Sequence, residues 1–337
     1  MRRHRMQNDR HYDGGAMRII AVLCAVWLLA PGHAASAQAY PTKPIRLVIH
    51  FPPGGPTDIV GRAVAQKLTE AWGQQVIVDN RPSAGGIVGV EAVVRSSPDG
   101  HTLLFATGGS MSIAPAFNPK LPYNVFKDLA PVSLVVINPQ ILVFHPAFPP
   151  NSVKELVALA KSRPGTINYA SVGPGSPNHL GMEMLKSMAG IDMVHIPYKG
   201  TAPALTDLLA GQVSLMFNSM PSVLPQVKSG KLKGIAVGSA KRSPAAPDIP
   251  TVAESGVPGF DYVTWYGLFA PAATPRAIIA KLNAQVVSML AEPELAQRLA
   301  VQGADPQSST PEGLARYMHE EHERWKKVIK SAGIKAE

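Results

Sequence analysis

The chain has 337 residues, of which 46% are hydrophobic and 16% are charged, and this balance excludes an intrinsically disordered protein. A chain of this length can bury a sizeable core and is long enough for two domains. The formal net charge is +9, but the Lys and Arg residues are scattered without interleaved aromatic stripes, so nucleic acid is not an expected partner.

Residues 1–37 are predicted to be a Sec-type signal peptide that is removed on export. The apolar run Ile19–Ala30 has 12 residues, follows Arg18, and precedes an A-x-A cleavage site that ends at Ala37. A membrane-spanning helix needs about 20 apolar residues, so the alternative of a membrane anchor is not favoured. The only cysteine, Cys24, lies in this segment, so the exported chain would have no disulfide and no thiol to ligate a metal.

The first part of the exported chain alternates between strand and helix patterns. Short apolar runs predict strands at residues 45–51, 75–80 and 101–107, and helical spacing predicts helices at residues 57–73 and 86–96. Thr57 or Asp58 is expected to cap the first helix, and Gly73 is expected to end it. This order predicts a parallel sheet with helices on both faces.

The alternation breaks at residues 129–146, where two β runs are expected on either side of Asn138–Pro139. A second α/β unit follows, and another β run is expected at residues 262–270. Two amphipathic helices, at residues 275–303 with a break at Pro293 and at residues 311–333, are expected to pack back on the first unit. Connections near residues 131–143 and 250–268 predict two lobes joined by a hinge, with a cleft between them.

Two loops share a design that suits the binding of an anion. The sequences FPPGGPTD (51–58) and SVGPGSPNH (171–179) each join a predicted strand to a predicted helix through glycine, proline and hydroxyl residues. The first N–H groups of a helix have no internal partner and carry the positive end of its dipole, and glycine lets a ligand approach the backbone. Ligands of open α/β sheets bind beyond the carboxyl ends of the strands, where both loops would lie. Each loop alone could be an ordinary tight turn with a helix cap, but the repetition in both units favours a binding site.

The rest of the candidate site comes from other loops at the predicted sheet edges. The segment FATGGSMS follows the third strand, Lys199 precedes a helix and could pair with a second carboxylate or be a solvated surface residue, and Asn218 ends a later strand. Trp265 and Tyr266 could wall a cleft, although core packing is the commoner role of such residues. The predicted ligand-binding residues are Phe51, Gly54, Gly55, Thr57, Asp58, Thr107, Gly108, Ser110, Ser171, Gly175, Ser176, His179, Lys199 and Asn218.

Motifs for bound nucleotides and for catalysis are missing from the sequence. Neither loop carries a Lys or Arg before its helix, and there is no Walker or dinucleotide-binding glycine motif, so a carboxylate that must be released again fits better than a nucleotide. There is no G-x-S-x-G motif, and His319 and His322 have the wrong spacing for H-E-x-x-H. His179 could act as a base, but no acidic partner is evident nearby in the sequence, and a role as ligand donor or cap is preferred. No cofactor, metal or catalytic residue is therefore predicted.

From about Tyr40 to Lys335 the sequence resembles the periplasmic solute receptors of tripartite tricarboxylate transporters, also called Bug receptors. The resemblance rests on four long ordered stretches: YPTKPIRLVIHFPPGGPTDIVGR, NRPSAGGIVGVEAVVRSSPDGHTLLFAT, HIPYKGTAPALTDLLAGQV and SAKRSPAAPDIPTVAESGVPGFD. It implies a two-lobed type II periplasmic-binding-protein fold, with lobes formed by residues 40–138 plus 262–337 and by residues 139–261. It also implies a periplasmic protein that closes on a small carboxylate, partly through ordered water, and delivers it to a membrane permease of one large and one small subunit. The protein is predicted to be a monomer.

The sequence departs from this family in two places. Pro174 and Pro177 stiffen the second loop, and Asn218 stands where an acidic residue is frequent, which weakens the case for an amino-acid ligand. Two alternatives remain open at this stage: an exported hydrolase-like enzyme that acts on a small acid or ester with Ser176 and His179 as its working pair, and a ligand sensor for a membrane regulator.

Overall fold

The first α/β unit is present as expected from the alternating pattern. The structure, a computed structural model, describes residues 40–83, 86–301 and 303–334. The predicted signal peptide lies outside these residues, and among those described no helix is long and apolar enough to cross a membrane. The fold is built within the unit Lys43–Glu337.

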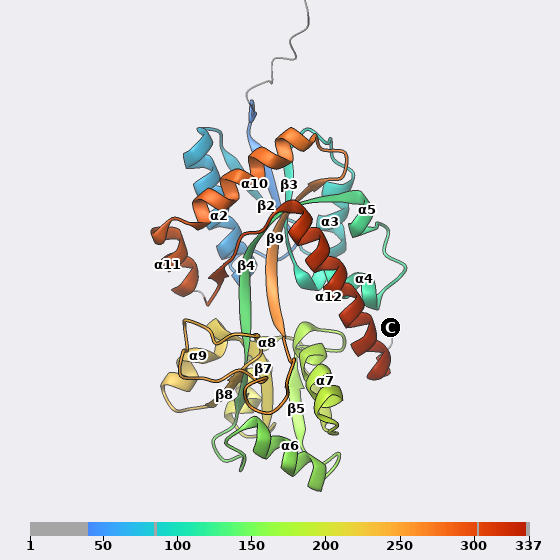
Figure 1. Ribbon diagram of the computed structural model, residues 1–337, viewed down its shortest axis with the longest axis vertical. Helices are drawn as coiled ribbons and strands as arrows, with labels where there is room; N and C mark the ends of the chain where they lie inside the picture. Colours follow the sequence, from blue (N-terminus) through green and yellow to red (C-terminus); the bar gives the residue numbers. More distant parts are fainter. Residues whose placement is uncertain (1–39, 84–85, 302, 335–337) are drawn as a thin grey trace, which may run out of the picture. The chain divides into compact units, whose positions relative to one another are not determined.

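Three parallel strands form one end of the sheet: β1 (Ile45–Ile49) in the middle, β2 (Val76–Asn80) and β3 (Thr102–Thr107). The helices α2 (Pro56–Trp72) and α3 (Ile87–Val94) connect them (Figure 1). β1 is almost continuously apolar and buried, as a strand covered on both faces must be. In α2, residues Val60, Val64 and Leu68 recur every four positions and are buried, which fixes the face that packs on the sheet.

Two long antiparallel strands, β4 (Leu129–Phe144) and β9 (Val263–Pro271), connect the two groups of strands (Figure 1). β9 pairs with β3 and with residues 129–139 of β4, whereas residues 140–144 of β4 pair with β7 (Leu215–Ser219) and residues 141–144 also with β8 (Lys233–Val237). The expected division of this segment into two β runs is wrong, because Asn138 and Pro139 continue the strand opposite Thr264 and Val263. Proline is tolerated here because it lies where the pairing passes from β9 to β7, so its missing N–H interrupts no continuous ladder.

The second group of strands repeats the parallel arrangement. β5 (Asn168–Ser171) lies between β7 and β6 (Val194–Pro197) and is parallel to both. The helices of this group are α6 (Val153–Ser162), α7 (Pro177–Ala189), α8 (Thr201–Leu209) and α9 (Met220–Lys228). The full path of paired strands is β2-β1-β3-β9-β4-β7-β5-β6, and the fold is therefore a mixed α/β fold in which antiparallel β4 and β9 separate two parallel groups.

After β3 the chain forms short helical turns instead of an open loop. They are the π-helical turn η2 (Gly109–Ile113), α4 (Ala114–Phe117) and α5 (Val125–Asp128). The C-terminal elements are α10 (Arg276–Leu290), α11 (Pro293–Val301), β10 (Asp305–Pro306) and α12 (Pro311–Ser331). The helix break expected at Pro293 is confirmed, since this proline begins α11.

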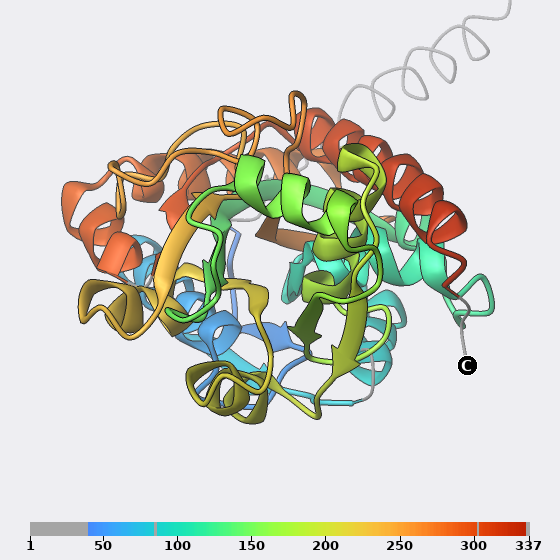
Figure 2. The ribbon, with the colours of Figure 1, turned by 90° about the horizontal axis from the view of Figure 1, so that it is seen from below.

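Helix α12 packs on both groups of strands, which the sequence pattern did not predict. Leu314 and Met318 belong to the core around β3 and β9, whereas Trp325, Val328 and Ile329 belong to the core around α7 and β7. A helix of 21 residues is about 32 Å long, so it can reach both cores. Viewed from below, α12 runs along one side of the molecule beside α7 (Figure 2).

Candidate functional site

The first predicted loop leads from β1 into α2 and is held by one carboxylate. Gly54 has a positive φ of 83°, and its N–H donates to Asp58 Oδ2 at 2.9 Å. The expectation that Thr57 or Asp58 caps α2 is wrong, because the cap is Gly55 and the helix begins at Pro56. Asp58 lies within the first turn, and its side chain turns back onto the loop instead of capping the helix.

Asp58 is a positioning residue whose oxygens are fully engaged. Besides the Gly54 amide, they accept hydrogen bonds from Arg62 Nε at 2.9 Å and Asn80 Nδ2 at 2.9 Å. Burial alone would raise the pKa of Asp58, but these hydrogen bonds and the Arg62 charge outweigh it, so the pKa lies below its ordinary value. Asn80 also donates to the carbonyl of Phe51, whose ring is exposed. The loop is therefore fixed without a free acidic group.

The beginning of α2 keeps unpaired amides. Among the described residues, the backbone N–H groups of Gly55, Thr57 and Asp58 have no acceptor. These amides carry the positive end of the dipole of a 17-residue helix. They can therefore receive an anionic oxygen, as the sequence predicts for this loop.

Tyr266 of β9 connects this loop to the two long strands. Its hydroxyl lies beside the polar side chains of Thr57 and Asn138, and Tyr266 pairs across the sheet with Thr107 at the end of β3. Burial raises the pKa of Tyr266, and the polar side chains of Thr57 and Asn138 partly offset that rise. The sequence alone did not decide whether Tyr266 lies in the core or lines a cleft, and it did not point to Asn138. The pairing of β4 with β9, which brings Tyr266 and Asn138 together, is not visible in the local pattern.

The segment after β3 lies against the beginning of α7. A β-carbon added at Gly108 would lie 2.4 Å from Trp265 Nε1, and one added at Gly109 would lie 3.8 Å from Pro177 Cγ. Pro177 is the first residue of α7, so the beginning of α7 lies against the segment whose Thr107 pairs with Tyr266. A β-carbon added at Gly54, in contrast, would meet no atom within 4 Å, so there is open space beside this glycine of the first loop.

The second predicted loop is closed by its own hydrogen bonds. The N–H groups of Gly173, Gly175 and Ser176 donate to Ser171 Oγ at 3.0 Å, His179 Nδ1 at 3.1 Å and the Gly173 carbonyl at 3.2 Å. Ser176 caps α7, as its side chain accepts from the His179 amide. The glycine amides that the sequence offers to a ligand are thus occupied, and the backbone N–H of Asn178 is the first in α7 without an acceptor among the described residues.

His179 has an acidic neighbour that sequence reasoning missed. Glu183 Oε1 lies 4.0 Å from His179 Nε2, one helical turn further along α7, and it accepts hydrogen bonds from Tyr169 at 2.5 Å and Lys186 at 2.8 Å. The i, i+4 spacing of His and Glu on one predicted helix was the available signal. Burial lowers the pKa of His179 despite the Glu183 charge, so the imidazole is neutral near pH 7.

The geometry does not support the hydrolase alternative. Ser176 Oγ donates to the Gly173 carbonyl at 2.6 Å, and the imidazole of His179 faces Gly175 instead of this hydroxyl. A second Ser–His contact, between Ser171 Oγ and His195 Nε2 at 2.6 Å, is present, but Ser171 is fully buried. No group of three metal-ligating side chains is found among the described residues.

The remaining candidates, Ser110, Asn218 and Lys199, come from three other segments of the chain. Ser110 Oγ donates to the carbonyl of Thr107 and so stabilises the turn after β3. Asn218 is buried at the end of β7, where its side chain accepts from the amide of Ser219. Lys199 is exposed and makes no ion pair with a described residue. No described contact joins Lys199 or Asn218 to Thr57 or Tyr266.

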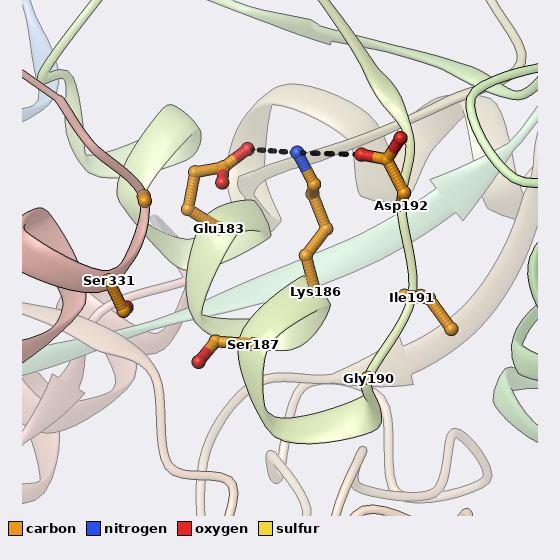
Figure 3. A pocket seen from close by; sticks show the side chains of 8 residues that line it. Glu183, Lys186, Ser187, Gly190, Ile191, Asp192 and Ser331 are labelled. Atoms are coloured by element: carbon orange, nitrogen blue, oxygen red, sulfur yellow. Dashed lines mark hydrogen bonds and ion pairs between the residues drawn. The ribbon is translucent and has the colours of Figure 1, made fainter.

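A separate cavity of about 350 Å³ lies between α7 and the end of α12. Figure 3 shows Lys186 reaching between Glu183 and Asp192, with Ser331 of α12 on the opposite wall. None of the predicted ligand-binding residues lines it. Because its one cation is already neutralised by two carboxylates, this cavity is not the predicted anion site.

The fold is that of periplasmic binding proteins. A protein from R. palustris solved with adipate is 34% identical, with a TM-score of 0.76 over 88% of this chain and 99% of that chain. MatC from Rhodopseudomonas palustris with bound malate is 35% identical, with a TM-score of 0.71 over 86% of this chain and 100% of that chain.

Sequence comparison gives the family. The model of the tripartite tricarboxylate transporter family receptor matches residues 60–334. The protein BugT of Bordetella pertussis is 37% identical over 321 residues, which cover 94% of this chain and 98% of BugT. The chain therefore belongs to the tripartite tricarboxylate transporter receptor family, and the resemblance seen in its sequence is confirmed.

Proposed function

We propose that this protein is a periplasmic receptor that binds a small carboxylate between two lobes and delivers it to the permease of a tripartite tricarboxylate-type transporter. The observation that carries the proposal is the set of unpaired amides of Thr57 and Asp58 beside the Tyr266 hydroxyl. Backbone amides at a helix beginning, next to a buried phenolic hydroxyl, are suited to a carboxylate. Pro177 lies against Gly109, two residues after Thr107 of β3, so the beginning of α7 would form a second wall.

The absence of a free cation at these described residues favours reversible binding. Arg62, the cation at the first loop, is paired with Asp58 at 2.9 Å. Amides and hydroxyls hold a carboxylate without the strong bidentate pairing that arginine would add, so the ligand can be released to a permease. The carboxylates adipate and malate in two relatives support this ligand class.

The proposed lobes are residues 40–138 with 262–337, and residues 139–261. β4 and the segment just before β9 would act as the hinge. β4 passes from pairing with β9 to pairing with β7 just after Asn138, and β9 begins opposite this point at Val263. Closure of the lobes would enclose the ligand at the Tyr266 hydroxyl and exclude water.

A melting-temperature screen of the refolded exported chain against monocarboxylates, dicarboxylates and tricarboxylates tests the proposal. Unfolding and refolding first removes any carboxylate that was carried through purification. A ligand at 100 times its Kd should stabilise the protein by about 2.7 kcal/mol, which is a readily measured shift. A panel in which no acid shifts the transition, while an uncharged solute does, would refute the carboxylate assignment.

A further inference from the structure

Three aromatic rings are stacked beneath the second loop. The rings of His179 in α7 and His195 in β6 are 3.9 Å apart and inclined by only 10°, and Tyr169 of β5 stacks on His195 at 5.1 Å. Tyr169 is fully buried and His179 is 6% exposed. The stack is therefore a rigid support below Gly173–Ser176.

Each imidazole holds one glycine of this loop. His179 Nδ1 accepts the hydrogen bond from the Gly175 N–H at 3.1 Å, so the ring proton must be on Nε2, which faces Glu183. His195 Nε2 contacts Ser171 Oγ, which accepts the Gly173 N–H at 3.0 Å. The loop shape thus depends on an acceptor nitrogen at His179.

We propose that His179 is a positioning residue of the ligand site, which holds the second loop in its binding shape through the Gly175 amide only while its imidazole is neutral. The proposal rests on the function proposed above. It assigns His179 a role through the loop backbone in place of a direct contact with the ligand, and it makes ligand affinity dependent on pH.

Protonation of His179 would place a second donor against the Gly175 N–H and would break this contact. The titratable and charged groups that face the ring are Glu183 and Lys186 of α7, Tyr169 of β5 and His195 of β6. The Glu183 carboxylate favours the imidazolium form of His179, but it also accepts hydrogen bonds from Tyr169 and Lys186. A positive charge on either histidine also repels a positive charge on the other.

The direction of the pH effect follows from this balance. Burial lowers the pKa of His179, and burial together with the charge of its neighbour lowers the pKa of His195 to about 4. Both rings are neutral at pH 7, so the loop is held there. The contact is lost as the pH falls through the pKa of His179 in the folded protein, which lies below the ordinary histidine value of about 6.5.

Two substitutions at His179 distinguish the effect of losing the hydrogen-bond acceptor from the effect of losing the packed ring. His179→Asn keeps an oxygen at the position of Nδ1 and cannot be protonated, whereas His179→Leu removes the acceptor at similar volume. His319→Asn, which alters a histidine stacked on Phe126 of α5, is the matched control. The Kd for adipate and for malate is measured at pH 7.5 and at intervals down to pH 4, and the exchange rate of the Gly175 amide is measured in the same variants without ligand.

We expect His179→Leu to bind about five- to tenfold more weakly at pH 7.5, the cost of one net hydrogen bond, and His179→Asn to restore most of the affinity. On acidification the wild type and His319→Asn should lose affinity more steeply than His179→Asn, because only they carry an imidazole at position 179 that can be protonated. The titration of the ligand itself affects all variants equally and cancels in this comparison. The Gly175 amide should exchange faster in His179→Leu than in the wild type or His179→Asn.

Parallel pH profiles for the wild type and His179→Asn, or equal affinities of the wild type and His179→Leu, would overturn the proposal. If neither adipate nor malate binds the wild type at pH 7.5, the ligand assignment fails separately. In that case the exchange of the Gly175 amide still decides whether His179 holds the loop: unchanged exchange in His179→Leu refutes it.

Discussion

Replacing Gly108 by alanine should destabilise the protein strongly, while the same change at Gly109 should not. The backbone at Gly108, with φ −55° and ψ −29°, suits alanine, so any cost must come from the added methyl group. That methyl would lie 2.4 Å from Nε1 and 2.7 Å from Cε2 of Trp265, whose side chain is fully buried and cannot move aside freely. The Trp265 indole also donates to the buried carboxylate of Glu321 at 3.3 Å.

The magnitude follows from these two contacts. Overpacking in a core costs about 1–3 kcal/mol, and weakening a hydrogen bond to a charged group adds about 1.5–3 kcal/mol if the ring is displaced. We expect a loss of about 3 kcal/mol in the free energy of unfolding, measured by urea denaturation and by melting temperature. Gly109→Ala meets nothing closer than 3.4 Å and should change stability by less than about 0.5 kcal/mol. Equal stabilities of the two variants would refute the reasoning that Gly108 is required by the close approach of Trp265.

Three further outcomes are expected. Asp58→Asn should be less stable than the wild type at pH 7, and the difference in the free energy of unfolding should shrink towards pH 2. The lowered pKa of Asp58 stabilises the fold above its unfolded value of about 3.9, and this contribution is lost in acid. Denaturation at a series of pH values measures the difference, and a difference that does not change with pH would contradict the prediction. Tyr266→Phe should weaken carboxylate binding about fivefold by calorimetry through loss of the hydroxyl beside Thr57, and unchanged affinity would remove Tyr266 from the site. Trp325→Ala should lower the free energy of unfolding, measured with denaturant, by about 3–5 kcal/mol, because the Trp325 ring is fully buried in the core around α7. A loss below about 1 kcal/mol would show that α12 is not anchored in this core.

The parts of the fold that sequence could predict are those set by local periodicity. The alternation around β1 and α2 and the glycine at the end of α2 were visible as patterns, and so was the break at Pro293. The continuous β4 was not, because Asn138–Pro139 is a turn signal locally and only pairing with β9 overrides it. The reach of α12 into the second core was also invisible, since an apolar stripe does not say how many partners it covers.

The candidate site shows the same division between local and long-range information. The two glycine and proline loops could be found because their chemistry is contiguous in the sequence. The Tyr266 hydroxyl and the Thr57 side chain come together from positions more than 200 residues apart, and the stack of His195 on His179 depends on the neighbouring strands β5 and β6. Such contacts are set by tertiary structure, so residue type alone could not show which hydroxyls and imidazoles lie together.

A crystal structure of the refolded chain grown with adipate tests carboxylate binding at the beginning of α2 most directly. We predict a carboxylate oxygen about 2.7–3.2 Å from the backbone nitrogen of Thr57 or Asp58, with the beginning of α7 on the other side of the ligand. Adipate bound elsewhere, with the amides of Thr57 and Asp58 facing only water, would contradict this assignment.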